Sequence, residues 1–577
     1  MPDATGLMTE TPATQPRGEK RQTSLAARGE PFVWLLGGAL VLGIVMIVGF
    51  LGLVLWNGIA TFYPKPIYVI STTDGKQLAG ELTRSETYRL GAEQLAALPE
   101  PVRQQVLAND GRAQRNLYRI GNFDLYNEDF RWVPAYNLAK AETPAGFYFV
   151  ERLEWGPFIG RIKGLSLDGK TVAGETLDRA LLNDAHAAAR KRYRQILAIE
   201  HDEIGAVNHR LNGERLRLRR AELRYGIDSP DYNRVKAETD AVRAASEKDY
   251  ARLTEAANKV KADDAKYTIT FVEIGGREKT AKLSEVVRLY DANVLGVGQQ
   301  LGVYFSRWFE FLTESPREAN TEGGVWPAIF GTFAMTLLMV IVVAPFGVIT
   351  ALYLREYAKQ GRLVSIVRIS VNNLAGVPSI VYGVFGLGFF AYVVGGSIDQ
   401  LFYPERLPNP TFGTGGLLWS ALTLAILTVP VVIVATEEAL AAVPRSMREG
   451  SLACGASKWQ TIRRIVLPRA MPGIMTGLIL AMARGAGEVA PLMLVGVVKL
   501  APELPIDGFA PFIHFERSFM HLGFHIFDVG FQSRNSEAAQ PMVFVTTLLL
   551  IVLIAAMNMA AIVIRNRLRR KMTGGAF

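Results

Sequence analysis

Cysteine is almost absent from this chain, with Cys454 the single one among 577 residues. An intrachain disulfide is therefore excluded, and packing and polar contacts have to hold the fold together. Charge is also absent from several long stretches of consecutive apolar residues. A soluble chain of this length would form several domains, whereas uncharged apolar runs of about 20 residues are typical of membrane-spanning helices.

The charged residues are gathered between the apolar runs and give a net charge of +9. Such a charge predicts an anionic partner. The basic residues lie beside apolar segments, which favours membrane lipid head groups over nucleic acid. The first 30 residues lack the order of a cleaved signal peptide, so we interpret the apolar run that follows them as a retained anchor.

Six segments have the length and composition of spanning helices. They are residues 32–57, 329–354, 364–394, 415–436, 472–498 and 541–564. The third and fifth are interrupted by glycine, proline or charge, which makes their limits less sharp than those of the others. The fold class predicted is an α-helical membrane protein with six spans.

Basic residues flank these spans unevenly. They lie in the N-terminal tail (1–31), the second loop, the fourth loop and the C-terminal tail (566–577), as Arg17, Lys20, Arg21, Arg28, Arg355, Lys359, Arg362, Arg368, Arg445, Arg448, Lys458, Arg463, Arg464, Arg469, Arg565, Arg567, Arg569, Arg570 and Lys571. Six spans place all four regions on one side of the membrane, which the positive-inside rule assigns to the cytoplasm. Both termini are thus expected inside the cell and residues 58–325 outside, in the periplasm.

The external insert at 58–325 has an organisation of its own. Alternation of apolar and polar residues predicts strands at Ile67–Ser71, Phe147–Leu153 and Tyr267–Ile274. Residues 176–225 and 231–264 are rich in helix-forming residues and flank a turn signal at 226–230. We predict an α+β domain from which two antiparallel helices project as a hairpin near 176–264.

One segment of the insert, Gly164–Thr171, matches the phosphate-binding loop pattern of nucleotide-binding proteins. The residues after it are poor helix formers, and Asp168-Gly169 suits a tight hairpin turn. Asp74-Gly75-Lys76 begins a near copy that lacks the leading glycine, so a shared turn explains both copies. We therefore predict two hairpins and no nucleotide site.

The fourth loop, 437–471, carries the most specific pattern in the chain. It reads Glu449-Gly450-Ser451, three residues, Gly455, nine residues, and Ile465-Val466-Leu467-Pro468. The small residues let a short helix approach a partner surface, and Gly455 permits a turn that a larger residue would obstruct. Pro468 is suited to the start of the next membrane helix. A basic loop lying on lipid head groups is the plainer alternative.

This spacing resembles the EAA loop of ABC importer permeases, with Gly450 and Ser451 standing in place of two alanines. Further segments are similar to PstA-type phosphate permeases, and the resemblance covers about 325–565. These segments are Asn372–Gly383, Thr436–Leu440 with Val443-Pro444, and Ala483–Leu492. The resemblance implies docking of 449–468 on a cytoplasmic ATPase and does not extend to the insert.

The fifth span contains two ionisable residues, Arg484 and Glu488. Such residues are costly at membrane depth and usually face a bundle interior or an aqueous path. Their four-residue spacing allows an ion pair on one helix face, and Gly485 and Gly487 are expected to leave open space beside it. We predict that Arg484 attracts phosphate while Glu488 weakens its hold, a structural ion pair being the alternative.

Two weaker signals complete the candidate sites. Gly376 and Pro378 interrupt the third span, so Ser379 is a candidate for lining the pathway. His514, His521 and His525 with Asp528 lack a complete ligand set of known spacing, so we predict a loop packed on the membrane surface and no metal site. Cys454 is interpreted as a small packing residue.

The resemblance implies a permease domain at 326–565 in a phosphate importer of the inner membrane, without a cofactor. Its partners would be a PstC-type second permease, two PstB-type ATPases and a PstS-type binding protein. Hydrolysis would occur in the ATPases, since this chain has no credible nucleotide site of its own. A permease for sulfate, molybdate or phosphonate is the closest alternative, and a membrane sensor with the hairpin as receptor is a more remote one.

Overall fold

The structure is a computed structural model that describes residues 30–317, 320–501, 503–533 and 536–573. The chain divides into two compact units, with the boundary between Trp56 and Asn57. Helix α1 (Glu30–Ala60) contributes the described part of the first unit. Its portion Phe32–Ala60 is apolar and long enough to cross a membrane, which confirms the first predicted span. The basic residues predicted for the N-terminal tail, Arg17, Lys20, Arg21 and Arg28, lie outside the described residues.

Five further stretches have the length and apolar composition of membrane spans, so the described residues contain six. Their elements are α9 (Trp326–Leu352) with η6 (Tyr353–Tyr357), α11 (Ser379–Phe385) with η7 (Gly386–Gly395) and α12 (Gly396–Phe402), α13 (Leu417–Ala441), α15 (Lys458–Thr461) with η9 (Ile462–Val466) and α16 (Leu467–Gly487), and α19 (Ser536–Thr573). The predicted fold class is therefore confirmed, while the limits of two spans differ.

The third span begins later than the predicted 364–394, because the stretch contains two helices. Helix α10 (Arg362–Leu374) ends before Pro378, and the span itself runs over Ser379–Phe402. Proline cannot donate the backbone hydrogen bond that a continuous helix would need. The fifth span, predicted at 472–498, is shifted the other way and covers Lys458–Gly487.

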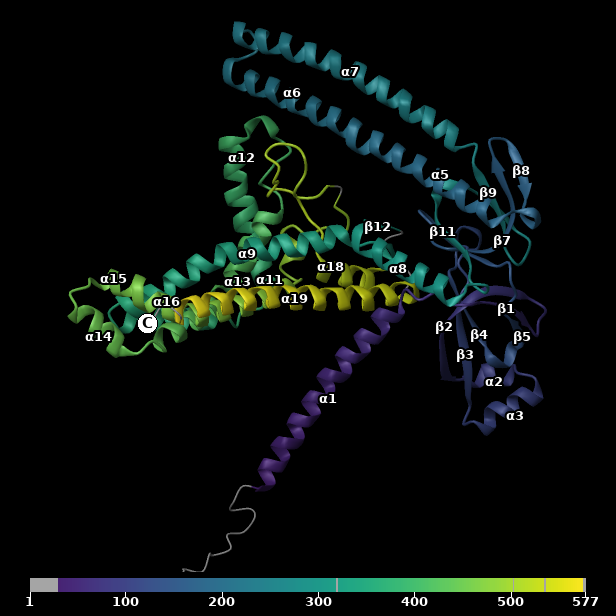
Figure 1. The fold of residues 1–577 in the computed structure, drawn as a ribbon, viewed down its shortest axis with the longest axis horizontal. Coiled ribbons are helices and arrows are strands. Elements are labelled where there is room, and N and C mark those ends of the chain that lie inside the picture. The colour runs from purple at the N-terminus through teal and green to yellow at the C-terminus, as the bar shows by residue number, and fades with distance from the viewer. Residues whose placement is uncertain (1–29, 318–319, 502, 534–535, 574–577) are drawn as a thin grey trace, which may run out of the picture. The chain divides into compact units, whose positions relative to one another are not determined.

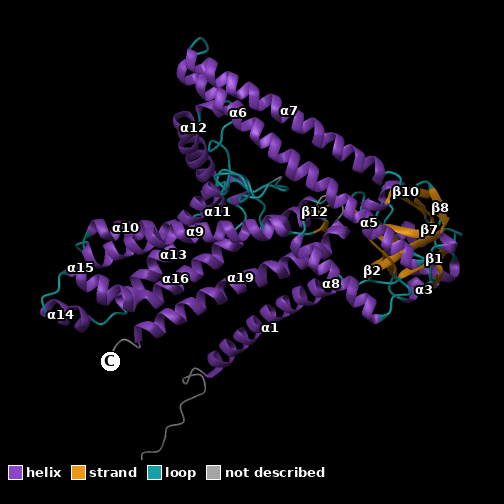
Figure 2. Cartoon of the chain, turned by 45° about the horizontal axis from the view of Figure 1, so that its top comes forward, coloured by secondary structure: helices purple, strands orange, loops and turns teal. Residues whose placement is uncertain are grey.

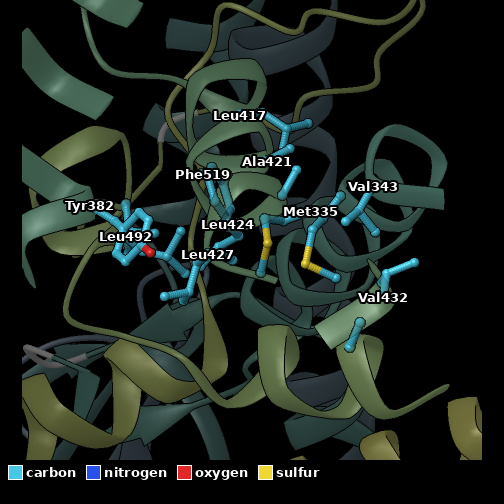
Figure 3. Close-up of a cluster of buried hydrophobic side chains, with 14 residues drawn as sticks. Met335, Val343, Tyr382, Leu417, Ala421, Leu424, Leu427, Val432, Leu492 and Phe519 are labelled. Atoms are coloured by element: carbon cyan, nitrogen blue, oxygen red, sulfur yellow. The ribbon is translucent and has the colours of Figure 1, made fainter. Parts of the chain in front are cut away.

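Helix α13 lies at the centre of the bundle, packed against α9 and α16. Figure 3 shows the buried side chains where α9, α13 and α17 (Leu492–Val495) meet, among them Met335, Val343, Leu424, Leu427 and Leu492. Small residues permit the close approach of these helices: a Cβ on Gly347 would lie 2.5 Å from Val432, and one on Gly477 would lie 2.5 Å from Ala435. Such contacts are typical of helices that pack in a membrane.

The described part of the insert contains two large antiparallel sheets and a two-stranded one, β12 (Pro316–Arg317) with β13 (Glu322–Gly323). The first has the strand order β4-β3-β2-β1-β5 and the second β10-β9-β7-β6-β11, with β8 paired to β7. The strands are β1 (Ile67–Thr72), β2 (Gln77–Arg89), β3 (Arg112–Arg119), β4 (Phe130–Pro134), β5 (Leu138–Glu142), β6 (Tyr148–Arg152), β7 (Phe158–Leu167), β8 (Lys170–Ala173), β9 (Thr268–Val272), β10 (Glu278–Lys282) and β11 (Val286–Asp291). All three predicted strands are present.

The stretch that matches the phosphate-binding loop is a hairpin, as predicted. Strands β7 and β8 pair with Leu167 opposite Lys170, and the turn residues Asp168 and Gly169 have φ values of 49° and 83°. The near copy joins β1 to β2, with Ser71 opposite Gln77 and Gly75 at φ 77°. Two positive φ values are the geometry that favours Asp-Gly in a two-residue turn.

A long helical hairpin projects from the second sheet, as predicted (Figure 2). It consists of α5 (Arg179–Leu197), η3 (Ala198–Glu203), α6 (Ile204–Tyr225) and α7 (Pro230–Asp264). The turn residue Gly226 has φ 76°, and the hydroxyl of Ser229 accepts a hydrogen bond from the backbone N–H of Tyr232 to cap α7. Proline at the first position of α7 completes this start signal.

The far part of this hairpin contacts loops that connect the membrane helices. Arg220 of α6 donates to Glu405, whose side chain is only 1% exposed, and His209 stacks on Phe509 with 4.3 Å between ring centroids. Burial of the Glu405 carboxyl acts to raise its pKa, but Arg220 holds that pKa below its ordinary value. The tip region of the hairpin thus contacts loops of the permease at a place remote from the sheets from which the hairpin projects (Figure 1).

Candidate functional sites

The fourth loop forms two short helices at the end of the bundle opposite the sheets (Figure 1). Helix α14 (Arg445–Ala453) is followed by a turn at Gly455, whose φ is 80°, and then by α15. Ser457 and Gln460 cap α15 reciprocally. The prediction that Gly455 allows a turn is confirmed, because this φ is one that side chains with a Cβ rarely adopt.

The outward surface of these two helices is open in the isolated chain. Leu452 is 49% exposed and Trp459 54% exposed, and Glu449 and Gly450 are exposed as well. Cys454 is also exposed, so its interpretation as a packing residue within this chain is wrong. Basic residues surround this surface. Trp459 and Leu452 add a large apolar area to it.

The inner side of the loop is anchored to the end of the second span. Arg448 of α14 lies 3.0 Å from Glu356, and it donates to the carbonyl oxygens of Val443 and Leu440 at 2.9 and 2.7 Å. The amine of Lys458 lies 4.9 Å from the ring centroid of Tyr357. Both loop helices therefore contact η6, so a displacement of the loop would be passed to α9.

The remaining residues of the loop motif join α15 to α16. Ser451 of α14 shares a hydrogen bond of 2.9 Å with Thr461. Ile465 and Leu467 are half-buried, and Pro468 lies in the first turn of α16, where proline is tolerated. The motif is thus one connected structure between the exposed surface and the membrane helix.

Arg484 and Glu488 come together as an ion pair, with Nε and Oε1 separated by 3.4 Å. The pair does not lie within one helix, because α16 ends at Gly487 and Glu488 is extended with ψ 133°. Arg484 forms no side-chain hydrogen bond with the described residues, and its side chain is 40% exposed. The guanidinium therefore retains donors that a bound anion can use.

The expectation of open space beside this pair is correct at one glycine and wrong at the other. A Cβ on Gly487 would meet nothing within 4 Å. A Cβ on Gly485 would lie 2.5 Å from the sulfur of Met339, so this glycine serves the packing of α16 against α9. The free volume lies on the side of Gly487.

Helix α11 passes close to the same region. Tyr382 interacts electrostatically with Arg484, and a Cβ on Gly383 would lie 2.7 Å from Cα of Pro491. Ser379 is the first residue of α11, directly after the break that ends at Pro378, and is half-buried. The broken third span thus places its new helix start one turn from Tyr382, whose hydroxyl donates to the carbonyl oxygen of Leu374 at 2.6 Å.

The histidines of the loop before the last span are buried within the protein, whereas Phe512 and Ile513 of the same loop are exposed, so packing of this loop on the membrane surface stays a prediction. His521 and His525 are 0% and 2% exposed, and His521 caps α18 (Leu522–Phe527) by accepting from the N–H of Gly523. Burial lowers the pKa of each to about 4, which keeps both neutral. Asp528 instead lies 3.1 Å from Lys499. Within the described residues, no group of three potential ligands could hold a metal ion.

One buried carboxylate and one network of charged residues were not anticipated. Asp399 is buried in the first turn of α12 and accepts hydrogen bonds from the backbone N–H groups of Thr411, Phe412 and Gly413. A network of arginine and glutamate side chains also fills the junction between the sheets and the bundle. Its members are distant in sequence, so no local pattern indicated it.

Basic residues from three of the four regions predicted to share one side lie at one end of the bundle, and the fourth region, the N-terminal tail, lies outside the described residues. The segment after α9, the loop of α14 and α15 and the end of α19 all lie there (Figures 1 and 2). Arg565 of α19 donates to Thr476 of α16 at this end. The sheets lie at the opposite end, and the helical hairpin runs from them back toward α12 (Figure 1).

The family can now be identified from comparisons with known proteins. Residues 343–573 match the family described as binding-protein-dependent transport system inner membrane component. The phosphate transport system permease protein PstA 1 of Mycobacterium tuberculosis is 35% identical over 261 residues, which are 45% of this chain and 76% of that protein.

The chain belongs to this family of inner-membrane permeases.

A second relative is the probable ABC transporter permease protein YqgH of Bacillus subtilis, 36% identical over 34% of this chain and 62% of its own length, so the chain spans less than two thirds of that relative. Among solved structures, the methionine transporter MetNI has 19% identity over 42% of this chain and 97% of that chain, with a TM-score of 0.30. A bacterial alginate transporter has 17% identity over 46% and 83%, with a TM-score of 0.34. The permease is a multi-pass inner-membrane protein and a transport component of an ABC importer, not a catalytic subunit.

Proposed function

We propose that this permease conducts inorganic phosphate across the inner membrane in an ATP-driven importer. The observation that carries the proposal is the ion pair of Arg484 and Glu488 at the end of a membrane helix, in a chain 35% identical to a PstA protein over 261 residues. An arginine in a spanning segment is costly and is retained mainly for function. The planar fork of arginine donors suits the oxygens of a tetrahedral anion.

Arg484 attracts the anion, and Glu488 limits how firmly it is held. The separation of 3.4 Å is longer than a charge-assisted hydrogen bond of about 2.7–2.9 Å, so the two side chains are not locked together. A phosphate oxygen can displace Glu488 from the guanidinium, and the returning carboxylate repels the anion afterwards. Gly487 leaves the space in which this exchange takes place, and Ser379 lines the path nearby.

The family and the loop geometry support a proposal for the partners of the permease. An ATPase docks on the exposed surface formed by Leu452, Trp459 and the residues of the loop motif from Glu449 to Pro468, on the cytoplasmic side. Its movement reaches α9 through the contacts of Arg448 and Lys458 with η6. A second permease of the PstC type, a PstB-type ATPase dimer and a PstS-type binding protein complete the importer, with 58–325 in the periplasm.

Uptake of labelled phosphate by cells that lack the chromosomal copy of this chain tests the proposal. Arg484→Gln should abolish uptake while the assembled complex is recovered in normal amount, because the amide lacks the charge that attracts the anion. Arg567→Gln makes the same chemical change at an exposed position of α19 and should leave uptake unchanged. Normal phosphate uptake by the Arg484 variant would reject the pathway, and loss of sulfate uptake alone would assign the permease to the other oxyanion.

A further inference from the structure

Helix α8 (Val297–Thr313) presents an apolar stripe at the end of the bundle nearest the sheets (Figures 1 and 2). The members of this α8 stripe are from 37% to 71% exposed and are Val297, Leu301, Phe305, Phe309 and Leu312. At 3.6 residues per turn, their spacing keeps all five within an arc of about 120° on one face. With about 200 Å² of surface for each phenylalanine, Phe305 and Phe309 alone expose about 270 Å². The whole stripe therefore reaches the size of the largest apolar patch on a typical soluble monomer, about 300–600 Å².

The polarity of α8 is the reverse of that expected for a helix on the surface of a soluble domain. Its only charged residues, Arg307 and Glu310, have side chains that are 14% and 10% exposed. Arg307 lies 2.6 Å from Glu151 of β6, and Glu310 lies 2.9 Å from Arg288 of β11. A helix in water would turn its charged residues outward and bury its apolar face. Because these ion pairs hold the charged side of α8 on the sheets, the α8 stripe is left facing outward.

The end of α8 is fixed to the start of the second membrane span. The backbone N–H of Trp326, the first residue of that span, donates at 3.1 Å to the carbonyl oxygen of Glu314, directly after α8. At 1.5 Å per residue, Phe309 and Leu312 lie only about 8 and 3 Å along the helix from Glu314. The exposed side chains of Phe309 and Leu312 are therefore close to the depth at which the span begins.

Aromatic side chains gather on the inner side of α8 at the same level. The first span ends at Ala60, and the ring centroid of Phe62 lies 5.1 Å from that of Trp308. The hydroxyl of Tyr63 donates to Gln300 at 2.7 Å. Tryptophan and tyrosine are enriched where membrane spans meet the head-group layer. The position of α8 in the fold is thus that of a helix at the boundary of the bilayer.

We propose that the α8 stripe lies against the lipids of the membrane, so that the insert rests on the bilayer surface through α8. Lipid is the occupant that the depth favours, because the bilayer around the second span also reaches the end of α8 that is attached to it. An amphipathic helix buries its apolar face about 5–10 Å into the boundary between head groups and acyl chains. The α8 stripe runs about 22 Å along the helix, so the contact is deepest at Leu312 and Phe309 and shallowest at Val297. The contact does not depend on which substrate the permease carries.

Photocrosslinking in membranes that contain the complete transporter tests this contact. Phe305→p-benzoylphenylalanine and Phe309→p-benzoylphenylalanine each place a photoreactive ketone on the α8 stripe, where it attaches to the molecule that covers it. Irradiation should give permease that carries a phospholipid as the main product at both positions, recognised by the mass of the adduct. Tyr250→p-benzoylphenylalanine is the matched control, because Tyr250 is an aromatic residue that is 43% exposed on α7 of the hairpin. It should give at least tenfold less lipid adduct.

Val297→p-benzoylphenylalanine, at the shallow end of the α8 stripe, should give less lipid adduct than the variant at Phe309. Recovery of the assembled transporter before irradiation shows that each variant is folded, and Leu312→p-benzoylphenylalanine provides the same readout if a phenylalanine variant is not recovered. The proposal is overturned if the main product on the α8 stripe is a crosslink to another subunit or to a second copy of the permease. It is also overturned if these positions give no more lipid adduct than the variant at Tyr250.

Discussion

The side chain of Trp459 offers the sharpest test of how the permease engages its ATPase. This residue is 54% exposed on α15, and capping of α15 by Ser457 and Gln460 does not involve its indole ring. A tryptophan presents up to about 250 Å² of surface, so the exposed part is about 135 Å². At 25 cal/mol per Å², burying this area against a partner contributes about 3 kcal/mol, or about a hundredfold in affinity.

The assay is the amount of ATPase that copurifies when the membrane complex is extracted in mild detergent. Trp459→Ala should reduce the ATPase recovered with the permease by at least tenfold, with the permease itself expressed and folded. Trp155→Ala is the matched control, because Trp155 is 53% exposed but belongs to the insert. If both variants retain the full complement of ATPase, Trp459 does not contribute to the docking surface and the reasoning from exposure is refuted.

Three further predictions concern stability and packing. Gly455→Val should cost about 1–2 kcal/mol because φ is 80° there, and ATP-driven transport should fall more than permease recovery, whereas Gly213→Val, in open space on α6 of the insert, should retain transport. Gly331→Ala should lower the unfolding temperature measurably, since the new Cβ would lie 2.0 Å from the carbonyl oxygen of Met520; an unchanged melting curve would contradict this contact between α9 and the segment before α18. The buried neutral histidines have pKa values of about 4 against an ordinary value near 6.5, so stability is present above pH 6.5 and is lost as the pH falls toward 4, by up to about 3 kcal/mol for each. His525→Gln should flatten this acid-induced loss in a series of thermal melts, and an equally steep loss in the variant would show that His525 is not its source.

The membrane spans could be predicted because each is a continuous apolar run, and a single physical rule selects them. The limits of the third span could not, since Leu374 and Ser379 lie in different helices that share one apolar pattern. The break at Pro378 is visible in the sequence, but whether a proline bends a helix or ends it depends on the neighbouring backbone.

Sites formed by residues close together in the sequence could be predicted, whereas sites formed by residues far apart could not. The turn at Gly455 and the pairing of Arg484 with Glu488 are local, and their spacing was sufficient to predict them. The contact of Arg119 with Glu322 joins residues far apart in the chain, so only the fold could bring them together. The packing of Gly485 against Met339 was missed for the same reason, because a glycine looks identical in sequence whether it faces space or a neighbouring helix.

The single cysteine provides the most direct test of the central claim, that the loop of α14 and α15 faces the cytoplasm and binds the motor. Cys454 is exposed in that loop, so it can be labelled without any engineered change. A membrane-impermeant maleimide should leave the permease unlabelled in intact spheroplasts, label it in inside-out vesicles, and label it less when the ATPase is present in the complex. Labelling from the outside of spheroplasts, or full labelling in vesicles whatever the amount of ATPase, would contradict the account.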